Sequence, residues 1–409
     1  MKLKLNHLQD PFVNTSIRIT GSKSETNRLL LLQALFPNIQ IENLSNSDDG
    51  QVMQQGLRAS RGEVDIHHAG TAMRFLTGYF ASQEGKDVVL TGSARMKERP
   101  IKVLVDALTD LGAEIEYTNT PGCPPLKISG KKLTKSKVAL PANVSSQYIS
   151  SLLLIAPSLE NGLELELIGK ITSVPYIKMT LSLLDELGIS TSFERNKIVV
   201  LPKKDVETKT MVVESDWSSA SYFYSIAAMC KVGSQIKLSA YKKNSLQGDS
   251  VLQEIYSKFG VETSFLNTEI TLKKIKEHST DFFEYDLSNA PDLAQTISVT
   301  CLGLGMGCHL TGLHTLPIKE TDRLAALKTE LTKLGAQVET DTESLILKPN
   351  ASIKEEISID TYHDHRMAMA FAPLALRTHL FVNDAGVVSK SYPDFWQDLK
   401  IIGLDIVEV

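Results

Sequence analysis

Charged residues gather in the segment Lys319-Glu320-Thr321-Asp322-Arg323, where five residues carry four charges. Apolar residues follow at helical spacing and stop at Gly335, so the sequence predicts an amphipathic helix over 321–334 with a glycine C-cap. The helix dipole places partial positive charge at the first turn, where the lysine and arginine add two cations. The segment is therefore a candidate anion site, with Glu320 as a titratable group. A solvated helix start with local ion pairs would show the same residues.

Similar residues stand at other predicted helix starts. The segment Gly21–Arg28 joins a strand to an apolar helix, and its glycine, serines and two cations suit a phosphate or a carboxylate. Ala69–Arg74 and Met96–Pro100 open two further helices with a glycine turn or cations. Ser145-Ser146-Gln147 and Ser173 supply neutral hydrogen-bond donors. Each segment alone also fits an ordinary capped helix.

Two further segments contain carboxylates. Asp292 precedes an apolar run and is either a helix cap or a base beside the anion site. His363-Asp364-His365-Arg366 could ligate zinc, but its arginine and Lys390 would repel a cation. We favour an arginine that serves the anion site and is held in position by the histidine and aspartate.

The candidate anion-binding side chains share a position beside helix starts or glycine turns: Lys23, Arg28, Arg74, Arg99, Lys319, Arg323, Arg366 and Lys390. Such a gathering of cations predicts one ligand, or a pair, with several negative charges. Carboxylates among them predict proton transfer.

Length and composition limit the remaining possibilities. A chain of 409 residues is long enough for two domains, and its formal net charge of −5 does not suggest a nucleic-acid partner. The four cysteines lack CxxC spacing, which indicates reduced cytosolic thiols. We expect neither a signal peptide nor a membrane span, because the apolar runs are too short or too polar.

The elements that would position these residues recur along the chain. A helix, a glycine and a short strand follow one another with the glycine at Gly112, Gly188, Gly260, Gly335 and Gly403. A weaker first copy runs through 52–60 and then 62–66. Six such copies predict three α/β modules in each of two domains. The phrase is also common in α/β proteins generally, so the repeat alone does not prove modules.

Together the motifs resemble one family, the EPSP synthases (3-phosphoshikimate 1-carboxyvinyltransferases). The matching stretches occur in family order along essentially the whole chain: Gly21–Arg28, Ser47–Asp49, Ala69–Arg74, Arg95–Pro100, Ser145–Gln147, Ser173–Tyr176, Asp216–Ser221, Pro291-Asp292, Lys319–Arg323, Asp364–Met369 and Lys390–Asp394.

The resemblance implies an α/β, two-lobed enolpyruvyl transferase fold, an inside-out α/β barrel in which each lobe has three βαβαββ units. Residues 1–20 with 215–409 would form the lobe that carries both termini, and 21–214 the inserted lobe. The active site would lie in the cleft between them. A cytoplasmic monomer is expected.

The implied enzyme transfers the enolpyruvyl group of phosphoenolpyruvate to the 5-hydroxyl of shikimate 3-phosphate, on the route to chorismate and the aromatic amino acids. Shikimate 3-phosphate would contact Lys23, Ser24, Arg28, Ser145, Ser146, Gln147, Ser173, Tyr176, Asp292, Thr315 and Lys319. Phosphoenolpyruvate would contact Lys23, Gly70, Arg99, Gln147, Arg323, Arg366 and Lys390. The catalytic residues would be Asp292, Lys319, Glu320 and Lys23, acting by addition and elimination without a cofactor or metal.

Three positions depart from the family pattern: His68 replaces the usual Asn, Phe75 the usual Pro, and Thr315 the usual substrate-binding polar residue. The herbicide glyphosate occupies the phosphoenolpyruvate site in this family, and the first two changes predict lower sensitivity to it. Two alternatives remain. A UDP-N-acetylglucosamine enolpyruvyl transferase would need a reactive cysteine, for which Cys123 is the candidate. A non-catalytic polyanion-binding protein would keep the cations but not the chemistry.

Overall fold

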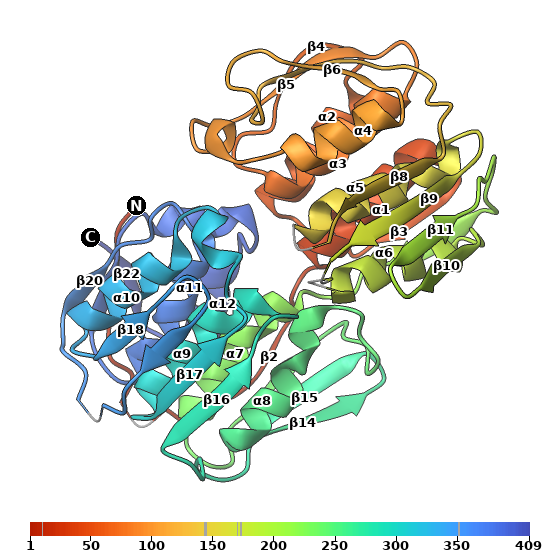
Figure 1. Cartoon of the computed structure of the whole chain (residues 1–409). Coiled ribbons are helices and arrows are strands. Elements are labelled where there is room, and N and C mark those ends of the chain that lie inside the picture. Colours follow the sequence, from red (N-terminus) through yellow and green to blue (C-terminus); the bar gives the residue numbers. More distant parts are fainter. Residues whose placement is uncertain (10, 143–144, 170, 172–173, 351) are drawn as a thin grey trace. The chain divides into compact units, whose positions relative to one another are not determined.

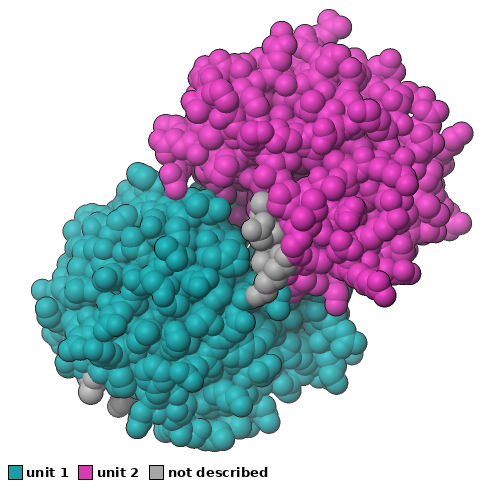
Figure 2. All heavy atoms as spheres, viewed as in Figure 1, with its two compact units in different colours: residues 1–20, 214–409 teal, residues 21–213 magenta. Residues whose placement is uncertain are grey.

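Six small sheets, each with helices packed against it, make up the chain (Figure 1). The computed structural model describes residues 1–9, 11–142, 145–169, 171, 174–350 and 352–409. These divide into two compact units: unit 1 contains Met1–Thr20 and Glu214–Val409, and unit 2 contains Gly21–Val213 (Figure 2). No helix among the described residues combines the length and the apolarity needed to cross a bilayer.

One βαβαββ pattern builds both units. Two parallel strands are joined by a buried central helix, and an outer helix then leads into an antiparallel hairpin. Unit 2 contains two complete modules. The first consists of β4 (Arg61–Asp65), α3 (Gly70–Ser82), β5 (Asp87–Thr91), α4 (Lys102–Asp110), β6 (Glu114–Tyr117) and β7 (Leu126–Ser129). The second consists of β8 (Lys137–Pro141), α5 (Ser146–Ile155), β9 (Leu163–Ile168), α6 (Val174–Glu186), β10 (Thr191–Glu194) and β11 (Lys197–Val200).

Unit 1 contains three modules of the same pattern. The first has β2 (Asn14–Ile17), α7 (Trp217–Met229), β13 (Gln235–Leu238), α8 (Leu252–Lys258), β14 (Val261–Leu266) and β15 (Glu269–Lys274). The second has β16 (Phe282–Asp286), α9 (Ala294–Gly303), β17 (Gly307–Thr311), α10 (Arg323–Lys333), β18 (Val338–Thr340) and β19 (Leu345–Leu347). The third has β20 (Ile357–Ile359), α11 (His365–Phe371), β21 (Leu380–Val382), α12 (Phe395–Ile402), β22 (Ile406–Glu408) and, from the N-terminus, β1 (Leu3–Leu5). Because β1 pairs with β22, both termini lie in this sheet (Figure 1).

The sixth module is incomplete. It contains α1 (Lys23–Leu35), β3 (Ile39–Glu42) and α2 (Asp48–Arg58), and β3 pairs in parallel with β12 (Lys209–Val212). The helix and strand predicted for this weaker copy, 52–60 and 62–66, correspond to α2 and β4. The strand β4 nevertheless pairs in parallel with β5 and opens the next module, so the sixth copy has no hairpin of its own after α2.

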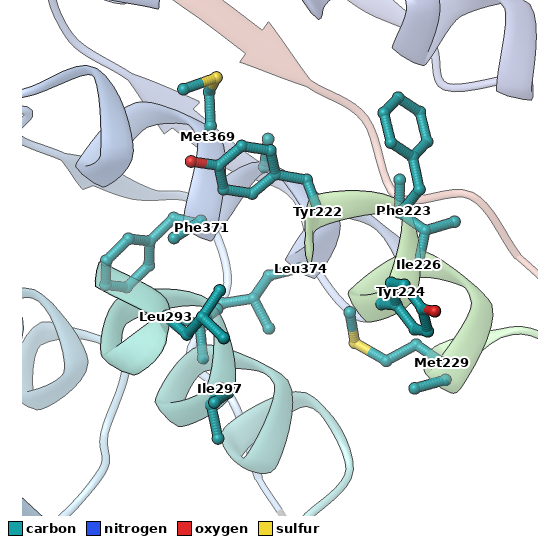
Figure 3. Close-up of a cluster of buried hydrophobic side chains, with 14 of the residues drawn as sticks. Tyr222, Phe223, Tyr224, Ile226, Met229, Leu293, Ile297, Met369, Phe371 and Leu374 are labelled. Atoms are coloured by element: carbon teal, nitrogen blue, oxygen red, sulfur yellow. The ribbon is translucent and has the colours of Figure 1, made fainter. Parts of the chain in front are cut away.

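The central helices lack a polar face, which explains why they lie inside their units. Every residue of α9 is buried, and so is nearly every residue of α7 and α3. In unit 1, side chains from α7, α9 and α11, including Tyr222, Ile297 and Phe371, meet in one apolar core (Figure 3). The outer helices are amphipathic, and α10 confirms the helix predicted over 321–334.

The repeated glycines end the outer helices as predicted. Gly112, Gly188, Gly260, Gly335 and Gly403 all have positive φ, between 71° and 109°, a conformation that other residues rarely adopt. Each lets the chain turn directly from a helix into the next strand.

Glu214 belongs to unit 1, although the sequence interpretation placed it in the inserted lobe. Its buried carboxylate accepts hydrogen bonds from the Trp217 indole N–H, the Lys242 backbone N–H and the Ser245 hydroxyl at 2.7–2.8 Å. These partners are all in unit 1, so the chain changes unit between Val213 and Glu214.

Candidate active site

The module pattern places the predicted site residues at two kinds of position. The first is the start of a central helix: Lys23 in α1, Gly70 in α3 and Ser146 in α5. The second is a short 3₁₀ turn before an outer helix, such as η5 (Leu316–Ile318) before α10. Both positions follow the carboxyl end of a strand, where helix N-termini offer free N–H groups to anions.

Arg323 is the centre of the charged cluster in unit 1. Its guanidinium is buried and donates to three carboxylates: Asp364 through Nε at 2.6 Å, Asp292 through Nη1 at 2.8 Å and Glu320 through Nη2 at 2.9 Å. Charge-assisted bonds of this kind fix the orientation of all four side chains. The sequence placed Arg323 at a helix start but did not indicate that carboxylates from three segments of the chain would surround it.

Asp292 lies in the 3₁₀ turn η4 (Pro291–Leu293), directly before α9. Its oxygens lie 2.8 Å from Arg323 Nη1, 3.2 Å from Arg366 Nη2 and 3.3 Å from Lys319 Nζ. Burial alone would raise the pKa of Asp292, but Lys319, Arg366 and Arg323 outweigh it and hold this pKa far below its usual value. Three cations therefore surround one carboxylate.

Glu320 connects this group to a fourth cation. It accepts from Arg323 through Oε2 and from Lys390 Nζ through Oε1, each at 2.9 Å. Lys390 ends the 3₁₀ turn η7 (Ala385–Lys390), which precedes α12. The structure thus brings six predicted residues of unit 1 into one contact network, together with Asp364: Asp292, Lys319, Glu320, Arg323, Arg366 and Lys390.

The side chains of the His-Asp-His-Arg segment, residues 363–366, lie in different surroundings. Asp364 caps α11 by accepting from the Arg366 backbone N–H at 2.9 Å, and its main side-chain partner is Arg323. His365 is buried beside Asp364, whereas the His363 ring is 93% exposed and pairs with Asp384. From the sequence we expected this aspartate to hold the Arg366 side chain in position. In the structure Asp364 contacts the backbone of Arg366 through the helix cap, and its carboxylate holds mainly the Arg323 guanidinium.

Two residues that sequence reasoning missed support Arg366. Arg366 Nη2 donates to the Ser218 hydroxyl at 3.2 Å, and that hydroxyl donates to the buried carboxyl of Asp249. Burial is the main cause that raises the pKa of Asp249 to about 6, against the lowering effect of Arg366. Asp249 lies in η3 (Gly248–Val251), the turn before α8, so the module position itself could have identified it.

In unit 2, two cations of α1 have different surroundings. Lys23 Nζ lies 3.3 Å from the carboxylate of Asp49, which stands in the first turn of α2. Arg28 is buried and donates to the neutral oxygens of Thr180, Ser24, Ser150 and Tyr176 at 2.7–3.4 Å. Burial lowers the pKa of Arg28 to about 10. A buried guanidinium among neutral oxygens is suited to an anionic ligand.

A second group of unit 2 forms around the start of α3. A Cβ added at Gly70 would come within 2.6 Å of Arg99 Nη1, so a larger residue here would displace the end of the Arg99 side chain. Gln147 Nε2 donates to the Thr71 hydroxyl at 3.1 Å, which links α5 to α3. Arg74 instead donates inward, to the carbonyls of Gly70 and Pro100, and is a structural residue of this turn.

The remaining predicted residues occupy helix starts or neighbouring turns. Ser145 caps α5 by accepting from the Gln147 N–H, and Ser146 is the first residue of that helix. Tyr176 lies in the first turn of α6, and Thr315 precedes η5. Ser173 lies outside the described residues. The Cys123 thiol lies 3.6 Å from the Glu98 carbonyl oxygen, to which it donates.

Comparisons with known proteins identify the family. A model of the family EPSP synthase (3-phosphoshikimate 1-carboxyvinyltransferase) matches residues 59–399. A 3-phosphoshikimate 1-carboxyvinyltransferase of Bacteroides fragilis (strain YCH46) is 44% identical over 398 residues, with 96% of each chain covered. One from Vibrio atlanticus (strain LGP32) is 35% identical over 422 residues, covering 96% of this chain and 97% of the relative. The chain belongs to the EPSP synthase family.

Solved structures agree on the fold. EPSP synthase from Acinetobacter baumannii superposes with a TM-score of 0.81 at 21% identity, covering all of both chains. The enolpyruvyl transferase NikO from Streptomyces tendae gives 0.75 at 14% identity, covering all of this chain and 99% of the other. The predicted enolpyruvyl transferase fold is confirmed, although none of the sheets among the described residues closes into a barrel. Family membership also confirms the predicted enzyme class and reaction, transfer of an enolpyruvyl group from phosphoenolpyruvate to shikimate 3-phosphate.

Proposed function

We propose that the charged clusters of both units bind one pair of substrates, phosphoenolpyruvate and shikimate 3-phosphate. The observation that carries this proposal is the carboxylate of Asp292, which three cations from separate elements surround. Cations so arranged suit ligands that bring several negative charges. The two substrates together bring two phosphates and two carboxylates.

Shikimate 3-phosphate is assigned to neutral donors and cations of unit 2 and to three residues of unit 1, which are Asp292, Thr315 and Lys319. The buried guanidinium of Arg28 supplies the strongest argument, because its present partners are neutral oxygens. The full set is Lys23, Ser24, Arg28, Ser145, Ser146, Gln147, Ser173, Tyr176, Asp292, Thr315 and Lys319. The 5-hydroxyl of the bound sugar would then face the proton carriers Lys319 and Asp292.

Phosphoenolpyruvate is assigned to the guanidinium and ammonium groups around Glu320 and Gly70. Arg323 and Arg366 already share the Asp292 carboxylate, which is the geometry that a substrate carboxylate requires. Arg99 beside Gly70 adds a cation that is close to free helix N–H groups. The full set is Lys23, Gly70, Arg99, Gln147, Arg323, Arg366 and Lys390.

Proton transfer is assigned to Lys319, Glu320, Asp292 and Lys23. An acid protonates the methylene carbon of phosphoenolpyruvate, and the sugar hydroxyl attacks the adjacent carbon as it gives its own proton to a base. A base then removes a methyl proton as phosphate leaves. The cations around Asp292 make it a weak base in this structure. Substrate anions would neutralise part of that charge and raise its pKa, so base strength would depend on bound substrate.

The experiment is an assay of phosphate release from phosphoenolpyruvate with shikimate 3-phosphate or UDP-N-acetylglucosamine as acceptor. Phosphate release with shikimate 3-phosphate but not with UDP-N-acetylglucosamine supports the proposal. Release with UDP-N-acetylglucosamine supports a UDP-N-acetylglucosamine enolpyruvyl transferase, and no release with either acceptor supports a binding protein. Lys319→Met should reduce kcat at least ~10²-fold, the range for a general acid or base. Lys328→Met, an exposed lysine of α10, is the matched control.

We further propose that the protein is a cytoplasmic monomer. The observation that supports the compartment is that its four cysteines are free thiols, three of them buried, as expected in a reducing environment, whereas the monomer is what the family resemblance implies. Light scattering should give a mass near 45.0 kDa, and cell fractionation should recover the protein with cytoplasmic markers. A mass of twice that value would exclude the monomer.

A further inference from the structure

Two consecutive residues before α11 adopt the left-handed backbone conformation. The φ angles are 53° for Tyr362 and 54° for His363, and neither residue is a glycine. Such a conformation is unfavourable for bulky side chains and persists only where the surroundings hold it. The next residue is Asp364, the carboxylate that binds Arg323 and caps α11.

A buried carboxylate holds the first of these residues. The Tyr362 hydroxyl donates to Glu330 Oε1 at 2.5 Å, and the Asp360 backbone N–H donates to Glu330 Oε2 at 3.2 Å. Glu330 lies in α10 with no exposed surface, and Lys333 Nζ donates to both of its oxygens at 2.8 and 2.9 Å. Glu330 thus holds both the Tyr362 side chain and the backbone two residues before it.

The second left-handed residue also has a partner. His363 Nδ1 lies 3.0 Å from Asp384 Oδ2, and Asp384 itself has a φ of 48°. Asp384 directly precedes η7, whose last residue is Lys390. The loop before α11 is therefore tied both to α10 and to the turn that carries Lys390.

The same helix meets this loop at two places seven residues apart. At the start of α10, Arg323 binds Asp364, and two turns later Glu330 binds Tyr362. Two contacts fix the direction as well as the position of the loop. Asp364, Arg323 and the first turn of α11 with Arg366 are then held as one rigid group.

We propose that Glu330 and Tyr362 are positioning residues that fix Arg323 and Arg366 for phosphoenolpyruvate. The inference rests on the proposed assignment of that substrate to the two arginines. Neither positioning residue needs to touch substrate, because each acts through Asp364. Losing the Tyr362 hydroxyl would let residues 362–363 relax from the left-handed conformation and move Asp364 away from Arg323.

Tyr362→Phe tests the proposal because it removes a single hydroxyl and leaves Glu330 paired with Lys333. We expect the KM for phosphoenolpyruvate to rise about tenfold and kcat to fall, since small displacements of binding groups are costly. The KM for shikimate 3-phosphate should change less than about twofold, because neither arginine is assigned to it. Glu330→Gln keeps one acceptor oxygen but turns an amide NH2 toward either the Tyr362 hydroxyl or the Asp360 N–H, so it should also raise the KM for phosphoenolpyruvate.

Tyr224→Phe is the control for a merely structural effect. It removes a comparable hydroxyl, which bonds Thr263 at 2.7 Å, and it should lower the melting temperature without changing either KM. If Tyr362→Phe behaves in the same way, the positioning role is wrong while the proposed function stands. If the natural protein releases no phosphate from the two substrates, the proposed function fails first and the inference fails with it.

Discussion

Asp249 is a single residue whose ionisation should affect the stability of the whole protein. Its pKa is raised from the usual 3.8 to about 6, chiefly by burial. Between these values the folded protein holds a proton that the unfolded chain has released, so stability falls as pH rises from about 4 to 6. A shift of this size corresponds to a loss on the order of 3 kcal/mol.

Asp249→Asn should remove this pH dependence because asparagine keeps a hydrogen-bonding group without the titration. Urea unfolding at several pH values would measure it. We expect the variant to gain stability relative to the natural protein from pH 4 to 6 and to keep a constant advantage above that range. Parallel curves for the two proteins would show that Asp249 has an ordinary pKa.

Phe75 contacts the substrate machinery more directly than its sequence position indicated. It lies one turn into α3, and its buried ring faces Arg28, with the guanidinium carbon 5.4 Å from the ring centroid. Phe75→Leu should raise the KM for shikimate 3-phosphate several-fold, which corresponds to about 1 kcal/mol, the size of a modest cation–π contact. Phe80→Leu, in the same helix but in contact with Tyr79, should leave that KM unchanged.

The predicted lower sensitivity to glyphosate also depends on Phe75. A shift of the Gly70 turn caused by Phe75 or His68 should disfavour the longer inhibitor more than phosphoenolpyruvate. Phe75→Pro and His68→Asn should therefore tighten glyphosate binding relative to phosphoenolpyruvate by about fivefold, or roughly 1 kcal/mol. Steady-state inhibition measures the ratio. An unchanged ratio in both variants would mean that the backbone does not shift.

At the scale of an element, the glycines that end the outer helices are needed for their backbone conformation. Gly112 has a φ of 107°, and nothing lies within 4 Å of an added Cβ, so crowding would not contribute to the effect of a substitution. Gly112→Ala should cost about 1–2 kcal/mol and lower the melting temperature by several degrees. Gly386 has equal space but no positive φ, so Gly386→Ala should be nearly neutral. Equal effects in the two variants would contradict the argument.

The same elements show what the sequence could and could not predict. Local sequence patterns account for individual helices and strands: the alternating apolar residues of 163–168 form β9, and Gly335 follows the end of α10. They also placed site residues at helix starts. They could not show that Arg323 also joins Asp292 and Asp364, or that Asp249 accepts from Ser218, because those contacts unite residues distant in sequence. The strand predicted at 62–66 exists as β4, but its parallel pairing with β5 depends on residues more than twenty positions away and could not be predicted from the local pattern.

At the scale of the molecule, the proposed shikimate 3-phosphate contacts come from both units. Lys23, Arg28 and Gln147 belong to unit 2, whereas Asp292 and Lys319 belong to unit 1. A ligand that binds groups on both units favours the arrangement in which all of them reach it. Neutralisation of the cations in each cluster would add to that preference.

Shikimate 3-phosphate should therefore lower the radius of gyration measured by small-angle scattering, and the decrease should saturate with ligand concentration. Inorganic phosphate at equal ionic strength is the control for general screening and should have little effect, because it cannot contact both units at once. Arg28→Ala should weaken the response by removing one anion contact from unit 2. A radius of gyration that stays constant at saturating ligand would contradict the prediction that shikimate 3-phosphate compacts the protein.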